Sequence, residues 1–130
     1  MLDALDKGAA KVVYGSRILG HNPMSRPSFY LGGRLLSLLT NLLYGTRITD
    51  EPTCYKMFRR EVLADIDLRC EGFEFCPEVT AKVARKGYRI AEVPIRYVPR
   101  DIREGKKIRW RDGWIAIRTL VRLRFSRDLP

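Results

Sequence analysis

Arg17 stands at a position where α/β proteins often bind phosphate. Residues 11–14 form a short apolar run that predicts a buried strand, and Gly15, Ser16 and Arg17 follow it directly. Ligands of open α/β sheets bind beyond the carboxyl ends of the strands, and a guanidinium placed there can form two parallel hydrogen bonds to phosphate oxygens. Arg17 is therefore a candidate phosphate ligand. The alternative is a surface arginine after a tight turn.

Carboxylates at two places in the chain could take part in chemistry. Asp50 and Glu51 lie on a loop before a predicted strand, where paired carboxylates can bind a metal or act as a base. The alternative for this segment is an ordinary turn. Glu74 lies between Phe73 and Phe75 just before a predicted helix. Aromatic rings around a carboxylate favour its neutral form, and the alternative for Glu74 is a helix cap.

Two further polar groups each allow a functional and a structural interpretation. Arg34, Ser37 and Asn41 share one face of a predicted helix, which is either part of a site or a solvated face. A loop near residue 105 carries four basic residues, which could clamp a phosphate or form an ordinary solvated run; they are Arg100, Arg103, Lys106 and Lys107.

The last predicted helix, residues 110–125, has an aromatic and aliphatic stripe beside an arginine strip. The stripe repeats every three to four residues and comprises Trp110, Trp114, Ile117, Val121 and Phe125, and the strip comprises Arg111, Arg118 and Arg122. Aromatic residues flanked by arginines suit a membrane interface. The alternative is a helix that packs on the domain and exposes a basic side.

These candidates require an α/β layer structure to position them. The hydrophobic patterns predict helices at 2–7, 28–44, 60–66, 77–86 and 110–125, and strands at 11–14, 54–58 and 88–97. Gly8, Gly45 and Gly87 are the expected helix stops, and Pro94 places the last strand at an edge or on a bulge. Because the chain opens on a helix followed by a buried strand, we expect it to begin inside a βαβ unit.

Composition narrows the classes of function. The 130 residues suit one domain, and 25 basic against 15 acidic side chains give a net charge of +10, which favours nucleic acid, anionic lipid headgroups or phosphorylated substrates. An odd count of three cysteines without metal-ligand spacing argues against both a disulfide framework and a zinc site, and a single histidine argues against a His-based metal site or a Ser/His/Asp triad. No apolar run approaches the roughly 18 residues of a spanning helix.

Six segments of the chain, in this order, resemble the family 2 glycosyltransferases of the dolichol-phosphate mannose synthase type. The segments are Val-Val-Tyr-Gly-Ser-Arg (12–17), Arg34-x-x-Ser37-x-x-x-Asn41, Asp50-x-x-Thr-Cys-Tyr-Lys-Met-Phe-Arg-Arg (50–60), Gly-Phe-Glu-Phe-x-Pro-Glu-x-Thr-Ala-Lys (72–82), Gly-Tyr-Arg-Ile-x-Glu-Val-Pro-Ile-Arg-Tyr (87–97) and Glu-Gly-Lys-Lys-Ile (104–108). The resemblance covers roughly residues 2–125.

The resemblance implies the C-terminal portion of a GT-A fold, a Rossmann-like α/β layer with amphipathic interface helices. It would span residues 1–109, followed by an amphipathic helix and tail at 110–130. The reaction implied is inverting transfer of a hexose from a nucleotide sugar to a polyprenyl or dolichyl phosphate. The protein would be cytoplasmic and peripheral, on the cytoplasmic face of a membrane.

The resemblance also implies roles for particular residues. Asp50 and Glu74 would be catalytic. Six basic residues would bind the acceptor and donor phosphates, namely Arg17, Arg34, Lys56, Arg59, Arg100 and Lys107. Four residues would face the membrane, namely Leu38, Leu42, Trp110 and Trp114.

The family's donor-binding strands and its Asp-x-Asp metal motif have no match in this chain. We therefore expect no metal ligands here, although Mg²⁺ or Mn²⁺ is expected for the full-length family member, and a partner chain could supply the missing half. Three hypotheses stay open: a glycosyltransferase fragment that is inactive alone, a non-catalytic basic module that binds lipid phosphate at a membrane surface, and a nucleic-acid-binding protein. The last rests on net charge alone, since no nucleic-acid-binding motif is present, and we expect no nucleic-acid partner.

Overall fold

The computed structural model describes residues 1–8, 10–23, 26–99 and 109–126. Its sheet has three strands, with β1 (Val12–Ser16) in the centre. β2 (Lys56–Phe58) pairs antiparallel with β1 on one side, and β3 (Ile90–Pro94) pairs parallel with it on the other. All five residues of β1 are buried, as expected for a strand flanked on both edges.

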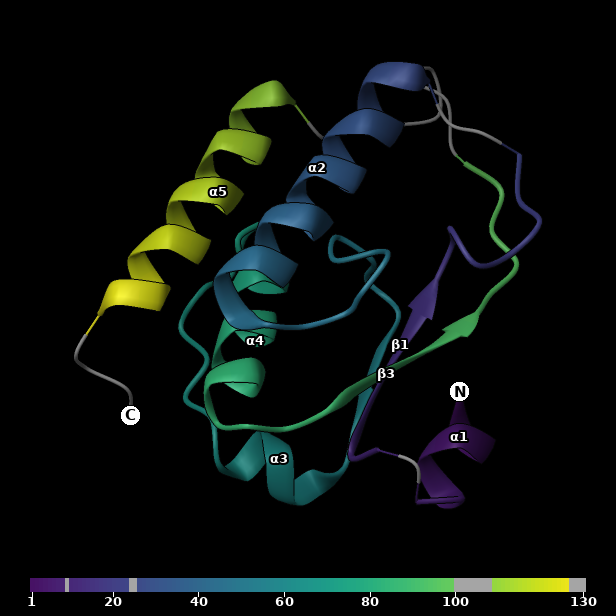
Figure 1. Ribbon diagram of the computed structural model, residues 1–130, viewed down its shortest axis with the longest axis vertical. Coiled ribbons are helices and arrows are strands. Elements are labelled where there is room, and N and C mark those ends of the chain that lie inside the picture. Colours follow the sequence, from purple (N-terminus) through teal and green to yellow (C-terminus); the bar gives the residue numbers. More distant parts are fainter. Residues whose placement is uncertain (9, 24–25, 100–108, 127–130) are drawn as a thin grey trace.

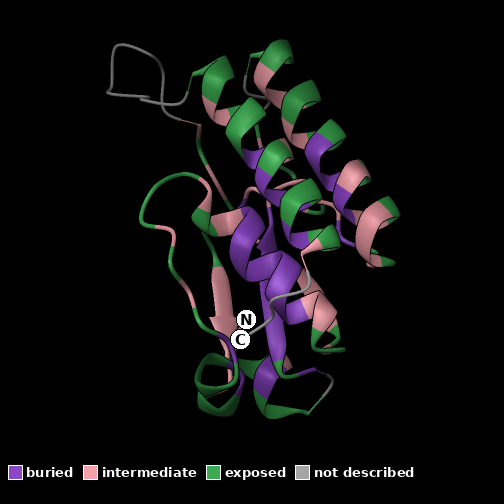
Figure 2. Ribbon diagram, turned by 90° about the vertical axis from the view of Figure 1, so that its left-hand side faces the viewer, coloured by how far each residue is buried: buried purple, intermediate pink, exposed green. Residues whose placement is uncertain are grey.

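Helices are stacked on the sheet in two successive layers (Figure 1). α1 (Leu2–Asp6) precedes β1, and α3 (Arg60–Ala64) follows β2. α4 (Phe75–Arg85) packs on the sheet, and α2 (Pro27–Tyr44) and α5 (Trp110–Phe125) cover the other side of α4. α4 is therefore the most enclosed helix of the described chain, as its continuous buried stretch in Figure 2 shows.

Two hydrophobic clusters follow from this layering. The first lies between the sheet and α3 and α4, and comprises Val12, Tyr14, Val62, Ile66, Val79 and Val83. The second lies between α4 and the α2/α5 pair, and comprises Leu36, Ala81, Ala116, Leu120 and Leu123. Tyr44 on α2 ties the two outer helices together, because its hydroxyl donates to the Leu120 carbonyl over 2.6 Å.

The helix stops are local and lie where the sequence predicts them. Gly45 follows α2 with φ of 67°, and Gly87 follows α4 with φ of 80°. This left-handed conformation costs glycine least, because glycine has no Cβ. Pro27 begins α2, where a missing N–H leaves no helical hydrogen bond unmade.

The predicted order of helices and strands and the α/β class are confirmed, and β3 with Pro94 is an edge strand as expected. The broad leucine face predicted on α2 is divided: Leu39 and Leu43 pack toward α5, whereas Leu35, Leu38 and Leu42 are exposed. Among the described helices, none combines the length and the apolar character needed to cross a bilayer.

Candidate phosphate-binding site at the carboxyl end of the central strand

The centre of the candidate site is the segment 49–53, which we call the 49–53 loop. It lies beside the carboxyl end of β1 and is held there by Glu92 of β3. One Glu92 carboxylate oxygen accepts hydrogen bonds from the Thr49 amide and hydroxyl at 2.8 and 2.9 Å, and the other accepts from the Asp50 amide at 3.1 Å. Three donors on one carboxylate fix the loop to the sheet.

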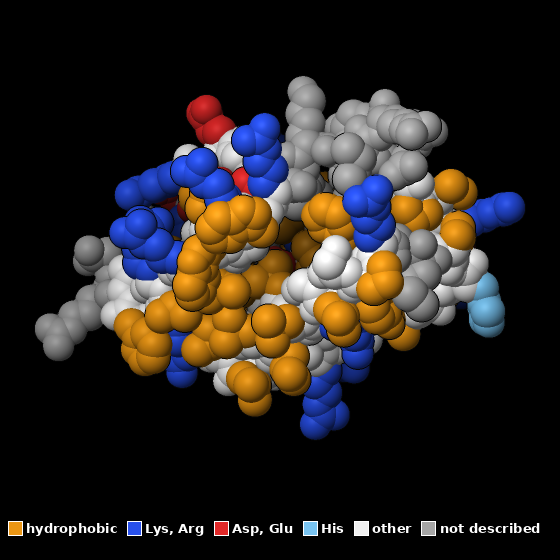
Figure 3. Space-filling model, turned by 90° about the horizontal axis from the view of Figure 1, so that it is seen from above, with side chains coloured by type: hydrophobic (Ala, Val, Ile, Leu, Met, Phe, Trp, Pro, Cys, Tyr) orange, Lys and Arg blue, Asp and Glu red, His pale blue; other side chains and the backbone are white. Residues whose placement is uncertain are grey.

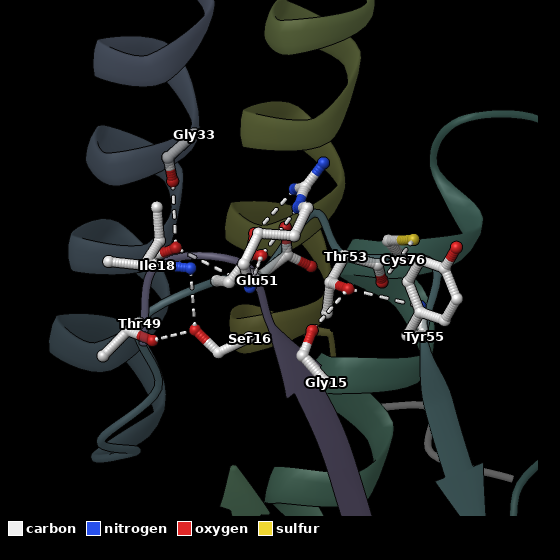
Figure 4. Close-up of polar contacts among 12 residues, drawn as sticks. Gly15, Ser16, Ile18, Gly33, Thr49, Glu51, Thr53, Tyr55 and Cys76 are labelled. Carbon is white, nitrogen blue, oxygen red and sulfur yellow. Dashed lines mark hydrogen bonds and ion pairs between the residues drawn. The ribbon is translucent and has the colours of Figure 1, made fainter. Parts of the chain in front are cut away.

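β1 and α2 hold the loop from two other sides (Figure 4). The Thr53 hydroxyl donates to the Gly15 carbonyl at 2.7 Å, and the Ser16 and Thr49 hydroxyls are hydrogen-bonded at 2.6 Å. From α2, the Ser37 hydroxyl accepts a hydrogen bond from the Glu51 amide at 2.9 Å. Gly15 leaves no room for a side chain, because a Cβ there would lie 2.7 Å from Ile95 Cγ2.

Arg17 and Asp50 form a two-point ion pair at this position. The Arg17 Nε and Nη2 atoms donate to the two Asp50 oxygens at 2.7 Å each, and the Arg17 amide adds a third bond at 2.9 Å. Asp50 is only 3% exposed, whereas Arg17 is 30% exposed. The pair raises the pKa of Arg17, chiefly through the hydrogen bond to Asp50. Two of the five guanidinium N–H donors are used in this fork, so the others stay available for an anion.

Two neighbours extend the site around Arg17. The Tyr97 ring lies under the guanidinium, with 5.3 Å between the guanidinium carbon and the ring centroid. Arg34 of α2 is exposed and donates to the Thr49 carbonyl at 3.1 Å, so it reaches the same loop as Asp50. The structure thus brings Arg17, Arg34 and Asp50 together.

The side chains of Glu51 and Lys56 lie on the inner side of the loop. Glu51 is fully buried, and neither carboxyl oxygen has a hydrogen-bond partner in the described part of the chain. Burial raises its pKa to about 7, and the positive charge of Lys56 opposes this shift. The Lys56 ammonium donates to the Glu51 and Thr53 carbonyls at 2.6 and 2.7 Å and lies 4.1 Å from the centroid of the Tyr14 ring. It therefore stabilises the loop from inside.

Three predicted site residues do not join Arg17 in the described structure, and two cannot be placed. Arg59 donates to the Leu5 carbonyl of α1 at 2.8 Å, at the end of β1 opposite to Arg17, because β2 runs antiparallel to β1. Lys56 is turned inward, as described above. Glu74 lines a shallow hollow with Cys70 and with side chains of α5. The predicted phosphate ligands Arg100 and Lys107 lie outside the described residues.

The structure contradicts one of the alternatives that the sequence left open. The stripe of Arg34, Ser37 and Asn41 is not a solvated face: Ser37 is buried, and the Asn41 amide binds both backbone groups of Ile48 at 2.9 Å, so the stripe faces the segment that leads into the 49–53 loop. The 49–53 loop does contain a turn, closed by the Thr53 amide on the Asp50 carbonyl at 3.3 Å, and its carboxylates Asp50 and Glu51 are buried.

Glu92 is a site residue that the sequence does not reveal, because a single acidic residue in a half-buried strand has the pattern of an outward-facing position. Its parallel pairing opposite Tyr14 brings it beside the loop. Nothing in the sequence alone gives this register.

An exposed apolar surface covers α2 and α5 (Figure 3). It includes the four residues expected to face a membrane, which are 56–78% exposed: Leu38, Leu42, Trp110 and Trp114. Most of the stripe on α5 is exposed, because α5 packs through Ala116, Leu120 and Leu123, whereas Ile117 of the stripe is partly buried against that cluster. Lysine and arginine side chains surround the apolar patch in Figure 3.

The described residues do not offer a metal site. No group of three or more histidine, cysteine, aspartate or glutamate side chains converges within them. Both oxygens of Asp50 are bound to Arg17, and Glu51 is enclosed. A divalent cation therefore does not fit the carboxylates found here.

Comparisons with characterised proteins identify relatives that transfer sugars. The chain is 30% identical over 124 residues to a low-salt glycan biosynthesis hexosyltransferase of Haloferax volcanii, covering 93% of this chain and 30% of that protein. It is 36% identical over 87 residues to an undecaprenyl-phosphate mannosyltransferase of Micrococcus luteus, covering 65% and 35%. It is 29% identical over 106 residues to a polyprenol monophosphomannose synthase of Mycolicibacterium smegmatis, covering 78% and 40%.

These similarities confirm the resemblance predicted from the six sequence segments. The chain spans between about a third and two-fifths of the length of these relatives. No family model matches the chain, and no solved structure matches it significantly.

Proposed function

We propose that this chain, a relative of the polyprenyl-phosphate mannosyl- and hexosyltransferases, is the part of such an enzyme that holds the lipid-phosphate acceptor. The full enzyme would have a GT-A fold and would transfer a hexose from a nucleotide sugar to a polyprenyl phosphate with inversion. The observation that carries the proposal is the Arg17–Asp50 pair at the carboxyl end of β1.

The geometry suits binding of a phosphate monoester more than proton abstraction. Asp50 holds Arg17 by two bonds, so the guanidinium plane is fixed and its outer N–H groups point away from the carboxylate. A phosphate acceptor is already anionic, and a strong general base is less needed than for a hydroxyl acceptor. In this proposal Arg17 and Arg34 neutralise and orient the acceptor phosphate, and Asp50 positions Arg17.

An enzyme that acts on a polyprenyl substrate must also bind to the membrane, and the exposed apolar surface of α2 and α5 is suited to this. The lipid tail stays in the bilayer, so the phosphate site must be held at the membrane surface. Exposed tryptophans and leucines flanked by basic side chains bind such interfaces. We therefore propose that Leu38, Leu42, Trp110 and Trp114 contact the lipid, with the protein on the cytoplasmic face of the membrane.

Donor binding and metal chemistry stay outside what the described residues can do. Mg²⁺ or Mn²⁺ is proposed for the full-length enzyme, where it would neutralise the nucleoside diphosphate leaving group. Since the carboxylates here do not fit a cation, no step of this proposal is assigned to one. Glu74, in its hollow beside α5, stays a predicted catalytic residue that does not face Asp50.

Vesicle flotation of the 130-residue chain tests the proposal. Phosphatidylcholine vesicles would be compared with the same vesicles containing polyprenyl phosphate. We expect polyprenyl phosphate to strengthen binding and Arg17→Ala to lower that gain about tenfold, as for loss of a charge-assisted hydrogen bond. Arg59→Ala removes the same charge at the other end of β1 and should leave the gain unchanged.

Two outcomes would contradict the proposal. Equal losses in the Arg17 and Arg59 variants would mean that net charge, not a site, drives binding. Tighter binding to duplex DNA than to either vesicle, with a steep dependence on salt, would favour the nucleic-acid hypothesis. Arg17→Lys serves as the second variant, because it keeps the charge next to buried Asp50 and loses only the fork geometry.

A further inference from the structure

Two thiols meet at the end of the 49–53 loop. Cys54 follows the loop directly and is exposed, and Cys76 lies in the first turn of α4 and is partly buried. The Cys76 Sγ donates to the carbonyl oxygen of Thr53, the residue before Cys54, at 3.7 Å (Figure 4). Each of the two thiols is also the largest influence on the pKa of the other, which marks them as neighbours. The third cysteine, Cys70, precedes α4 and borders the hollow beside α5.

The surroundings make the two thiols chemically unequal. The neighbouring Cys76 thiol lowers the pKa of Cys54 to about 6, and the positive charges of Lys56 and Arg17 lower it further against the opposing effect of burial. The neighbouring Cys54 thiol and burial raise the pKa of Cys76. Cys54 is therefore mostly thiolate at neutral pH, whereas Cys76 keeps its proton. A thiolate that is exposed and beside basic groups is the nucleophile in thiol–disulfide exchange.

We propose that Cys54 and Cys76 are a reversible dithiol–disulfide site, in which Cys54 attacks a small-molecule disulfide such as glutathione disulfide and Cys76 resolves the product. The Cys54 sulfur forms a bond to one sulfur of the small disulfide, and the other leaves as a thiolate. That thiolate takes the Cys76 proton, and the Cys76 sulfur then attacks Cys54 Sγ. The second small thiolate leaves and takes a proton from solvent. The protein loses two electrons, and the small disulfide is reduced to two thiols.

A disulfide bond between Cys54 and Cys76 would link the 49–53 loop covalently to α4. In the reduced protein only the weak hydrogen bond from Cys76 to the Thr53 carbonyl joins them at this point. The loop carries Asp50 and, through it, Arg17. Oxidation of the two thiols would therefore restrain the loop of the candidate phosphate-binding site from the side of α4. The inference goes beyond the proposed function and does not depend on it.

Peptide mapping of the full chain after equilibration with glutathione disulfide tests this site. Free thiols would be alkylated, and the digest analysed without reduction. We expect a peptide linked through Cys54 and Cys76 in the unchanged protein and equally in Cys70→Ser. In Cys76→Ser we expect Cys54 to accumulate as a lasting mixed disulfide with glutathione, because no resolving thiol is left.

Each alternative result overturns the inference. A mixed disulfide that persists on Cys54 in the unchanged protein would show that Cys76 cannot reach it. A disulfide bond from Cys54 or Cys76 to Cys70 would contradict the assigned pairing. If Cys54 reacts no faster than Cys70, Cys54 is not the assigned nucleophile. Circular dichroism of each variant before oxidation ensures that the comparison is made on folded protein.

Discussion

Glu51 gives the structure a pH-dependent stability that can be calculated and tested. Its carboxyl is fully buried without a hydrogen-bond partner among the described residues, and its pKa is raised from 4.5 to about 7. The native state therefore holds a proton that the unfolded chain has already lost between these two values. Because the native state binds more protons there, stability falls as pH rises through this window.

The size of the effect follows from the two pKa values. At pH 5.5 the native carboxyl is protonated and the unfolded one mostly is not, whereas at pH 8 both are ionised. Linkage between these states gives a loss of about 2 kcal/mol of unfolding free energy from pH 5.5 to pH 8. Glu51→Gln mimics the protonated side chain at both pH values, so it should remove this loss.

The assay is urea unfolding followed by far-ultraviolet circular dichroism, under reducing conditions at pH 5.5 and pH 8. The stability difference between the Glu51→Gln variant and the unchanged protein should be about 2 kcal/mol more in favour of the variant at pH 8 than at pH 5.5. Glu61→Gln is the matched control, since Glu61 is exposed, pairs with Lys11 at 2.6 Å and has a lowered pKa. The reasoning is refuted if the Glu51 difference is the same at both pH values.

Four further substitutions test separate features of the fold by urea unfolding at pH 7. Glu92→Gln replaces one of the two accepting oxygens by an amide donor, so at least one of the three hydrogen bonds is lost and the change should cost about 1–3 kcal/mol; an unchanged midpoint would mean that the loop does not depend on this strand. Tyr14→Phe removes the buried 2.9 Å bond to the Thr80 hydroxyl and should cost about 1 kcal/mol, with no loss arguing against that bond. Gly45→Ala should destabilise by about 1 kcal/mol because its φ is 67°, whereas Gly113→Ala, inside α5 with open space at Cβ, should stabilise by a similar amount. The same sign for both glycines would contradict this account.

The sequence was sufficient to predict the secondary-structure elements because their signals are local. Periodicity of three to four residues marks α2 and α5, and Gly45 and Gly87 end helices through their own backbone conformation. Arg17 was also identified as a candidate from local sequence, because the end of a buried strand is a recurrent ligand position.

The contacts that build the site could not be predicted because they join distant segments. Glu92 meets Thr49 across 43 positions, and that contact depends on the register of a parallel strand pair. Arg59 was grouped with Arg17 from sequence, yet antiparallel pairing of β2 sends it to the other end of β1. The leucine pattern of α2 did not show which of its leucines are buried, since leucines occur on both the core side and the exposed side of this helix.

Binding of a soluble isoprenyl phosphate at Arg17 is the central claim, and side-chain nuclear magnetic resonance tests it most directly. The Arg17 Nε–H signal would be assigned by its loss in Arg17→Lys and followed during titration with geranyl phosphate. We predict a saturable shift of this signal with geranyl phosphate, a weaker one with inorganic phosphate and none with geraniol. Movement of other arginine signals while Arg17 stays unchanged would contradict the assignment of the acceptor phosphate to this site.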